Sequence, residues 1–223
     1  YALYWGKCIY ILSYDVAKNP VKLSKFLYDN KVAEVFMPPS VVKTYKEVSP
    51  YLKNVIVAGD VSSRLYIKGV NFINNYGSSE SCNTVASFLI DKPYDKTPVG
   101  KNRVGLEVKL LDEENKEVED GEVGEICYKS EYTRGYINLP EKTKEVFIDG
   151  YYHMGDLGYK DENGDIVICG RKDDMVKING NRIEPVEIEL VLREELEINN
   201  VMVKGFKEDR EFICAYFLKE EIE

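Results

Sequence analysis

The stretch of the sequence with the most chemical content is N-N-Y-G-S-S-E, residues 74–80. It places an aromatic ring at Tyr76, a glycine at Gly77, two hydroxyls and the carboxylate of Glu80 within five residues. A ring can stack on a nucleotide base, a glycine lets the backbone approach a ligand, and hydroxyls can donate to a phosphate. A carboxylate can hold the magnesium ion of that phosphate. These residue types indicate a nucleotide site, and a polar turn is the alternative interpretation.

Length and charge limit the classes of function. The chain has 223 residues and a net charge of −9, with both signs of charge interleaved along it. That length suits one large domain or two to three small ones. The acidic balance argues against a nucleic-acid partner, which needs clustered lysine and arginine. No apolar run approaches the length of a membrane span, so a membrane partner is not expected either.

The cysteines and the single histidine argue against a zinc site. Five cysteines are scattered without a C-x-x-C spacing, and His153 is the only histidine. An odd number of thiols in apolar surroundings indicates reduced, buried cysteines and a cytoplasmic protein. The chain starts at Tyr1 rather than at Met and shows no signal peptide. From that start we expect a piece of a longer protein.

Residues 1–97 alternate between strand-like and helix-like patterns. Expected strands cover residues 8–12, 32–37, 54–58 and 70–74, and expected helices cover residues 20–30, 40–45 and 62–68. Asn19 followed by Pro20 is a typical helix start. This alternation predicts a parallel sheet with helical crossovers, in which ligands bind at the carboxyl ends of the strands. Tyr76 and Gly77 follow the strand over 70–74 and are therefore expected at such an end.

The pattern changes after residue 97. Short apolar runs separated by glycine turns predict an antiparallel sheet or barrel over residues 98–171. A helix over 185–197 and strands over 200–206 and 211–218 are expected next, too few elements to bury a core by themselves. The expected fold class is α/β: a parallel-sheet subdomain (1–97), an antiparallel β-barrel-like subdomain (98–171) and the start of a small α+β domain (172–223).

Several segments, read in order, resemble the motifs of the adenylate-forming family: acyl-CoA synthetases, luciferases and the adenylation domains of nonribosomal peptide synthesis. Residues 74–80 resemble N-x-Y-G-P-T-E, 124–126 and 134–136 resemble G-E-L and R-G-Y, 152–157 resemble Y-R-T-G-D-L, 170–178 resemble G-R-x-D-x-Q-V-K-I, and 180–189 resemble G-x-R-I-E-x-x-E-I-E. Each motif is short, but their order over most of the chain makes the resemblance strong.

The resemblance implies an AMP-forming acid–thiol ligase. Arg182-Ile183-Glu184 is closer to amino-acid-activating domains than to the N-I-Y-P form common in CoA ligases. The implied reaction uses ATP and Mg²⁺ to convert a small carboxylic acid, here an amino acid, into acyl-AMP. The acyl group then passes to the phosphopantetheine thiol of a carrier protein. Two alternatives stay open: an acyl-CoA ligase for a fatty or aromatic acid, with CoA as acceptor, and a non-catalytic nucleotide-binding remnant.

The same resemblance implies roles for individual residues. Ser79 would donate to the α-phosphate, where charge develops, and Glu80 would serve catalysis as a magnesium ligand. Tyr76 would stack on adenine, with Asn75 and Gly77 beside it in the nucleotide site. Taken singly, Tyr76 is as well explained as a core tyrosine, Ser79 as a turn residue and Glu80 as a solvated or capping glutamate.

Two further nucleotide-binding residues are implied later in the chain. Asp156 would accept hydrogen bonds from both ribose hydroxyls, and Arg171 would contact the ribose or a phosphate. Their alternative interpretations are a hairpin aspartate and a salt-bridging arginine. Asp173 would be the hinge about which the small domain rotates, because a short polar residue between domains can absorb a change in φ and ψ. Without the resemblance, Asp173 would be interpreted as an exposed charge.

The acyl pocket is implied by alignment with the segments that line it in the family. Phe36, Ile56, Ala58 and Asn83 would line the pocket, together with Asn75. The two asparagines add polarity, which favours a polar or small side chain on the substrate.

The sequence also departs from the family's pattern. The phosphate loop of the S-G-T-T-G-x-P-K-G type is expected before Tyr1, and the G-K-x-D lysine segment after Glu223. We therefore expect the chain as given to be inactive by itself. Serines at 78 and 79 replace Pro and Thr, and His153-Met154 replaces Arg-Thr. Because His153 stands where the family has arginine, we do not interpret it as a catalytic base.

Overall fold

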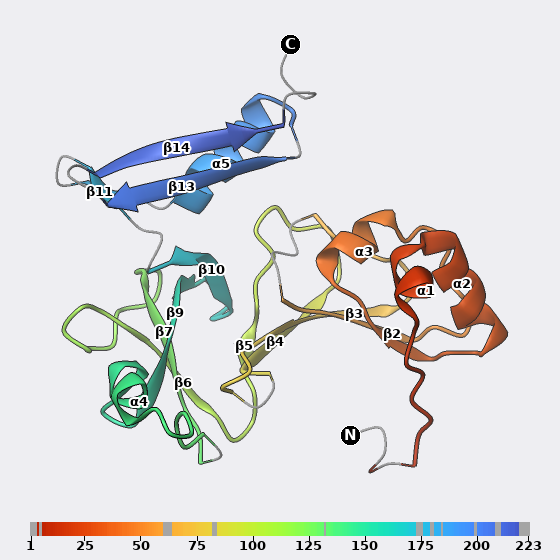
Figure 1. Cartoon of the computed structure of the whole chain (residues 1–223), viewed down its shortest axis with the longest axis horizontal. Coiled ribbons are helices and arrows are strands. Elements are labelled where there is room, and N and C mark those ends of the chain that lie inside the picture. Colours follow the sequence, from red (N-terminus) through yellow and green to blue (C-terminus); the bar gives the residue numbers. More distant parts are fainter. Residues whose placement is uncertain are drawn as a thin grey trace. The chain divides into compact units, whose positions relative to one another are not determined.

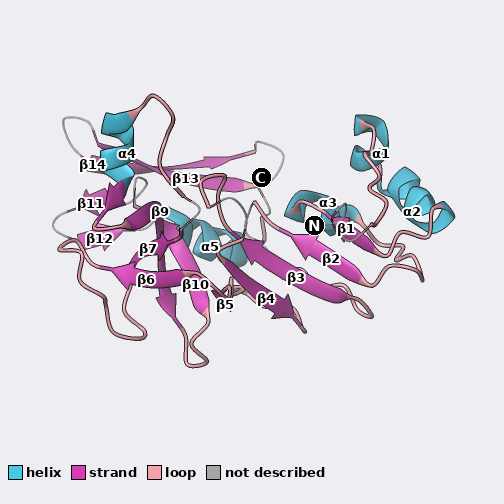
Figure 2. Ribbon diagram, turned by 90° about the horizontal axis from the view of Figure 1, so that it is seen from below, coloured by secondary structure: helices cyan, strands magenta, loops and turns pink. Residues whose placement is uncertain are grey.

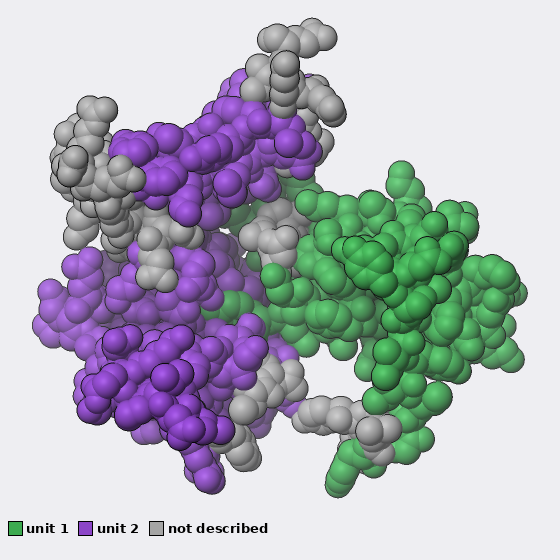
Figure 3. All heavy atoms as spheres, in the orientation of Figure 1, with its two compact units in different colours: residues 1–76, 88–97 green, residues 77–87, 98–223 purple. Residues whose placement is uncertain are grey.

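The computed structural model describes residues 4, 6–59, 64–81, 84–131, 133–172, 176–178, 181–183, 185–198, 200–207 and 211–218. The chain divides into two units, which Figure 3 colours separately. Unit 1 consists of residues 1–76 and 88–97, and unit 2 of residues 77–87 and 98–223.

The first sheet has the strand order β1-β2-β3-β4-β5; Figure 1 labels β2 to β5, and Figure 2 also labels β1. β1 (Glu34–Phe36), β2 (Asn54–Val57) and β3 (Asn71–Tyr76) pair in parallel. β4 (Ala86–Ile90) and β5 (Lys101–Asn102) pair antiparallel with each other. The parallel arrangement predicted from the alternating strand and helix patterns is therefore present in β1 to β3.

Three helices accompany the parallel strands: α1 (Tyr14–Lys18), α2 (Pro20–Asp29) and α3 (Pro39–Thr44). The start of α2 confirms the sequence signal, because the Asn19 side chain accepts hydrogen bonds from the backbone N–H groups of Val21 and Lys22. Such a cap satisfies N–H groups that have no partner within the helix.

The core of unit 1 lies where α2 and α3 meet one face of these strands. Its most buried members come from the helices, from β2 and from β3: Leu23, Leu27, Val42, Val55, Val57 and Phe72. Each is at most 5% exposed. Burying aliphatic and aromatic side chains in this way is the main favourable contribution to folding.

Two predicted elements of unit 1 are wrong. Residues 8–12 form no strand, and Ile9 and Ile11 are 52% and 94% exposed. Apolar composition predicted that strand, but a strand also needs a hydrogen-bonded neighbour. Residues 64–68 are not helical either: Leu65 and Ile67 are buried while Tyr66 between them is exposed. Burial of alternate residues is the period of extended chain, not of a helix.

The second sheet lies in unit 2 and is antiparallel, with the order β10-β9-β7-β6 (Figure 2). Its members are β6 (Glu107–Leu111), β7 (Gly124–Lys129), β9 (Tyr151–Lys160) and β10 (Ile166–Arg171), with β8 (Phe147–Ile148) paired to β9 and α4 (Pro140–Val146) preceding β8. The strands approach closely at Gly158, where a Cβ atom would lie 2.7 Å from the Val167 carbonyl oxygen. Register shifts interrupt β7 and β10.

The C-terminal part of unit 2 holds two hairpins and a helix. β11 (Val176–Ile178) pairs with β12 (Asn181–Ile183), and β13 (Val201–Lys207) pairs with β14 (Glu211–Phe217). α5 (Pro185–Glu195) packs on the second hairpin through a separate small apolar cluster. That cluster contains Ile198, Val201 and Val203, with Ile188, Leu192, Ile213 and Phe217 against it.

The fold class predicted from the sequence is confirmed: a largely parallel sheet, then a curled antiparallel sheet, then a small α+β part. The boundaries at residues 97 and 171 stay predictions. Among the described residues, no helix has the length and apolar character to cross a membrane.

Candidate functional site

The loop that follows β3 is tied to a distant segment through Glu80. The Tyr136 hydroxyl donates to Glu80 Oε1 at 2.8 Å, and the Thr133 hydroxyl donates to the Glu80 carbonyl oxygen at 3.1 Å. The hydroxyls of Tyr136 and Tyr152 lie 3.3 Å apart. Because all four residues belong to unit 2, the part of the motif that follows Tyr76, the R-G-Y segment and β9 meet within one unit.

The pKa of the Glu80 carboxyl is lowered, so the group is ionised at neutral pH. Its own backbone N–H lowers the pKa of the carboxyl most, burial opposes this, and the Tyr136 hydroxyl lowers it further. Burial, followed by the hydrogen bond with Tyr136, raises the pKa of Tyr152. The result is an anionic oxygen ligand beside a neutral phenol. Hard carboxylate oxygen is what Mg²⁺ prefers, so Glu80 fits the metal role predicted for it.

Asp156, inside β9, and Arg171, the last residue of β10, come together across the two neighbouring strands. The two residues are register partners in β9 and β10, and Arg171 Nη1 donates to Asp156 Oδ1 at 2.7 Å. The Asp156 side chain is 18% exposed and that of Arg171 is 49% exposed. Gly155 precedes Asp156 with a φ of 72°, a left-handed conformation that glycine adopts without strain. The structure thus brings together two residues that were predicted separately for the nucleotide.

The other predicted nucleotide residues lie around the end of β3. Tyr76 is the last residue of β3 and is 9% exposed, so little of its ring surface faces solvent. Asn75 is half-buried, on the opposite face of the strand, and Gly77 and Ser79 are exposed. Stacking of Tyr76 on adenine and donation from Ser79 to a phosphate stay predictions.

Part of the predicted acyl pocket shares one face of the first sheet. Phe36 and Ile56 are direct partners in the register of β1 and β2, and Phe36 is 61% exposed. Ala58 follows β2 and is half-buried. Asn83 and the hinge residue Asp173 lie outside the described residues. The pocket and hinge roles remain predictions.

The sequence interpretation missed Glu125 as a participant in the site. This glutamate lies in β7, and its side chain is only 6% exposed. Its Oε2 atom accepts from His153 Nδ1 at 3.0 Å and from the Lys172 ammonium at 2.8 Å, and its Oε1 atom accepts from the Gly155 N–H at 3.1 Å. A carboxylate inside an otherwise apolar strand was the available signal, because buried charges are paired.

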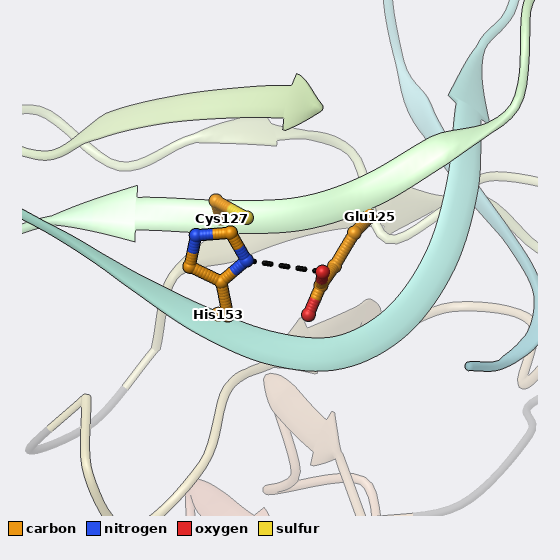
Figure 4. Close-up of side chains that lie close together, drawn as sticks. All are labelled: Glu125, Cys127 and His153. Carbon is orange, nitrogen blue, oxygen red and sulfur yellow. Dashed lines mark hydrogen bonds and ion pairs between the residues drawn. The ribbon is translucent and has the colours of Figure 1, made fainter. Parts of the chain in front are cut away.

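Glu125, Cys127 and His153 also form a group with metal-ligand chemistry (Figure 4). Their ligand atoms lie within 4.8 Å of one another, and His153 Nε2 is buried without a hydrogen-bond partner. The electrostatics oppose a metal, because the Lys172 ammonium already occupies the Glu125 carboxylate. Burial, and next the Glu125 charge, raise the pKa of Cys127 to about 12, which keeps the thiol protonated. The group fits an ion-pair network better than a metal centre.

Acid is expected to destabilise unit 2 through Glu125. Burial raises the pKa of this carboxyl, but His153 and Lys172 outweigh burial and hold it below the ordinary 4.5. With a depressed pKa in the folded state, the contribution of Glu125 to the free energy of unfolding is complete above the ordinary pKa. This contribution is lost as the pH falls through the pKa that Glu125 has in the folded state.

The measurement is the free energy of unfolding of the chain and of its Glu125→Gln variant. The difference between them should shrink on acidification from about pH 6 to about pH 3. Glu114→Gln, at an exposed glutamate, is the matched control and should show a small difference throughout. A Glu125→Gln difference that stays constant over this range would contradict the expectation.

Known sequences resemble this chain along nearly all of its length. It is 31% identical over 230 residues to bacitracin synthase 1 of Bacillus licheniformis, covering 98% of this chain and 4% of that protein. It is 30% identical to tyrocidine synthase 2 of Brevibacillus parabrevis, covering 96% of this chain and 6% of that protein. It is 32% identical to gramicidin S synthase 2 of Brevibacillus brevis, covering 99% and 5%. The chain thus spans a small part of these relatives.

Solved structures share the fold. An amide bond synthetase from Marinactinospora thermotolerans superposes with a TM-score of 0.77 at 23% identity, over 88% of this chain and 44% of that one. An anthranilate CoA ligase in complex with anthranoyl-AMP also superposes with a TM-score of 0.77, at 24% identity, over 94% of this chain and 42% of that one. The sequence model described as AMP-binding enzyme matches residues 9–137. The chain therefore belongs to the AMP-binding enzyme family.

Proposed function

We propose that this chain is part of an AMP-forming ligase that activates an amino acid as aminoacyl-AMP and passes it to a carrier-protein thiol. The observation that carries the proposal is the half-buried Asp156 carboxylate, fixed by Arg171 where β9 and β10 meet. A carboxylate accepts from two neighbouring hydroxyl donors at once, which is what the 2′ and 3′ hydroxyls of a ribose offer.

In the proposed reaction, the substrate carboxylate attacks the α-phosphate of ATP and pyrophosphate leaves. The protein's contribution is to position the reactants and to neutralise charge. Ser79, exposed in the loop after β3, donates to the α-phosphate, and Glu80 holds Mg²⁺. When bound, the metal neutralises the phosphates and the leaving pyrophosphate. Tyr136 orients the Glu80 carboxylate for this task.

The amino-acid branch rests on sequence. Arg182-Ile183-Glu184 resembles the amino-acid-activating form of the motif, and relatives at about 30% identity are synthases named for bacitracin, tyrocidine and gramicidin S. On this branch, carrier-protein phosphopantetheine is the proposed acceptor. Phe36, Ile56, Ala58, Asn75 and Asn83 are the proposed pocket residues, and Asp173 is the proposed hinge.

We place the protein in the cytoplasm. Cys8, Cys127, Cys169 and Cys214 are free thiols in the structure, and Cys127 and Cys169 are buried. ATP and reduced thiols are both typical of that compartment.

Substrate-dependent ATP–pyrophosphate exchange tests the proposal in the full-length protein, with a panel of amino acids and apolar carboxylic acids. We expect exchange with one or a few amino acids. Exchange only with apolar acids, followed by transfer to CoA, would identify a CoA ligase instead. No exchange with any acid, in a folded protein that binds ATP, would favour the nucleotide-binding remnant.

A further inference from the structure

We propose that Glu125 is a positioning residue for the nucleotide. Its buried carboxylate holds the left-handed Gly155 of β9, which precedes Asp156, and the end of β10, which carries Arg171, in one arrangement. The inference rests on the proposed function, because it presumes that Asp156 and Arg171 bind the ribose or a phosphate. Glu125 acts through their chain neighbours, Gly155 and Lys172.

One contact of Glu125 is the hydrogen bond to Gly155 in β9. Glu125 Oε1 accepts from the N–H of Gly155, which immediately precedes Asp156. Gly155 adopts a left-handed conformation that other residues enter only at a cost. Fixing its N–H therefore fixes the direction in which the chain leaves toward Asp156.

A second contact of Glu125 is with Lys172, directly after the end of β10. Glu125 Oε2 accepts from the ammonium of Lys172, which immediately follows Arg171. The backbone N–H of Lys172 also donates to the Gly155 carbonyl oxygen at 2.8 Å. Gly155, Glu125 and Lys172 thus form a closed ring of three hydrogen bonds, and the ring lies next to the Asp156–Arg171 ion pair.

The two side chains of the Glu125–Lys172 ion pair differ in their exposure to solvent. The Glu125 side chain is 6% exposed and that of Lys172 is 49% exposed, so the lysine brings a partly solvated cation to a buried anion. A buried carboxylate without a cation is strongly disfavoured. His153 donates to the same oxygen. Removing the Lys172 charge leaves imidazole as the remaining side-chain donor, and we expect the backbone of β9 at Gly155 to lose its fixed geometry.

The test uses Lys172→Met and Glu125→Gln in the full-length protein, with ATP–pyrophosphate exchange as the assay. Each variant should raise the KM for ATP about tenfold, the size expected from a weakened charge-assisted hydrogen bond. The KM for the amino acid and kcat should change by less than about threefold, because neither depends on the residues proposed to hold the ribose. Lys172→Arg keeps the cation and should recover most of the loss.

Two variants serve as controls. Lys144→Met removes an exposed lysine that pairs with Glu141 at 3.0 Å, and should leave the KM for ATP unchanged. Cys127→Ala removes the thiol from the same buried group. It should cause a small loss of stability and leave the KM for ATP unchanged. A loss in Cys127→Ala equal to that in Glu125→Gln would indicate a metal centre and overturn the proposal.

The remaining outcomes separate this inference from the proposed function. Normal exchange in the parent, with an unaltered KM for ATP in both folded variants, overturns the positioning role and leaves the function standing. Equal increases in both KM values would show a general structural role and overturn it too. If Lys172→Met does not fold, Glu125→Gln and the Lys172→Arg recovery decide the question. No exchange in the parent overturns both proposals together.

Discussion

Replacing Asp156 with alanine in the full-length protein is expected to raise the KM for ATP about a hundredfold, with the KM for the amino acid nearly unchanged. The physical reason is the loss of two charge-assisted hydrogen bonds to the ribose, each contributing about 1.5 kcal/mol or more. Exchange assays with ATP and the amino acid varied in turn measure both constants. Because the interaction is with the nucleotide, binding of the other substrate should not change.

The matched control is Asp95→Ala. Asp95 pairs with Arg64 at 2.9 Å, as Asp156 pairs with Arg171, but the Asp95 side chain is 86% exposed. Exposed ion pairs contribute little to stability, so this variant should behave as the parent does. Comparable increases in both KM values for Asp156→Ala would count against the ribose role and favour the alternative of a hairpin aspartate.

Replacing Glu80 with glutamine is expected to lower kcat for exchange by about a hundredfold at fixed Mg²⁺, a typical cost of removing one group that stabilises transition-state charge. Glutamine is nearly isosteric and still offers an oxygen to the Tyr136 hydroxyl, so the loop should keep its place. What is lost is the negative charge that draws the metal. Higher Mg²⁺ should therefore restore part of the activity.

The measurement is the exchange rate as a function of MgCl₂ for the parent, Glu80→Gln and Tyr136→Phe. Tyr136→Phe removes only the orienting hydroxyl and should cost about tenfold. Glu141→Gln, at a glutamate whose side chain is 80% exposed, is the control. An unchanged Mg²⁺ requirement in Glu80→Gln would exclude the metal role and return Glu80 to the polar-turn interpretation.

Local patterns were sufficient for much of the fold. Asn19 and Pro20 mark the start of α2 correctly, because a capping side chain and a first-turn proline act within one turn of the chain. Alternating strands and helices predicted a parallel arrangement, which β1 to β3 show. The motif order predicted the AMP-binding enzyme family, to which the chain belongs.

Local patterns failed where contacts with distant residues decide the secondary structure. The apolar composition of residues 8–12 predicted a strand. In the structure these residues form no strand, and Ile9 and Ile11 are exposed. At 64–68, both helix and extended chain fit so short a run, and packing of Leu65 and Ile67 into the core selected the extended form.

The sequence by itself determined which chemical groups are available: the anionic Glu80, the carboxylate of Asp156, the guanidinium of Arg171 and the motifs that contain them. Only the tertiary structure decided their partners. Tyr136 reaches Glu80 from 56 residues away, and Lys172 reaches Glu125 from 47 residues away. Hydrogen bonds from these distant residues help to lower the pKa of Glu80 and of Glu125, and they fix the direction that each of the two carboxylates faces. No local pattern contains that information, because it arises only when the strands pair.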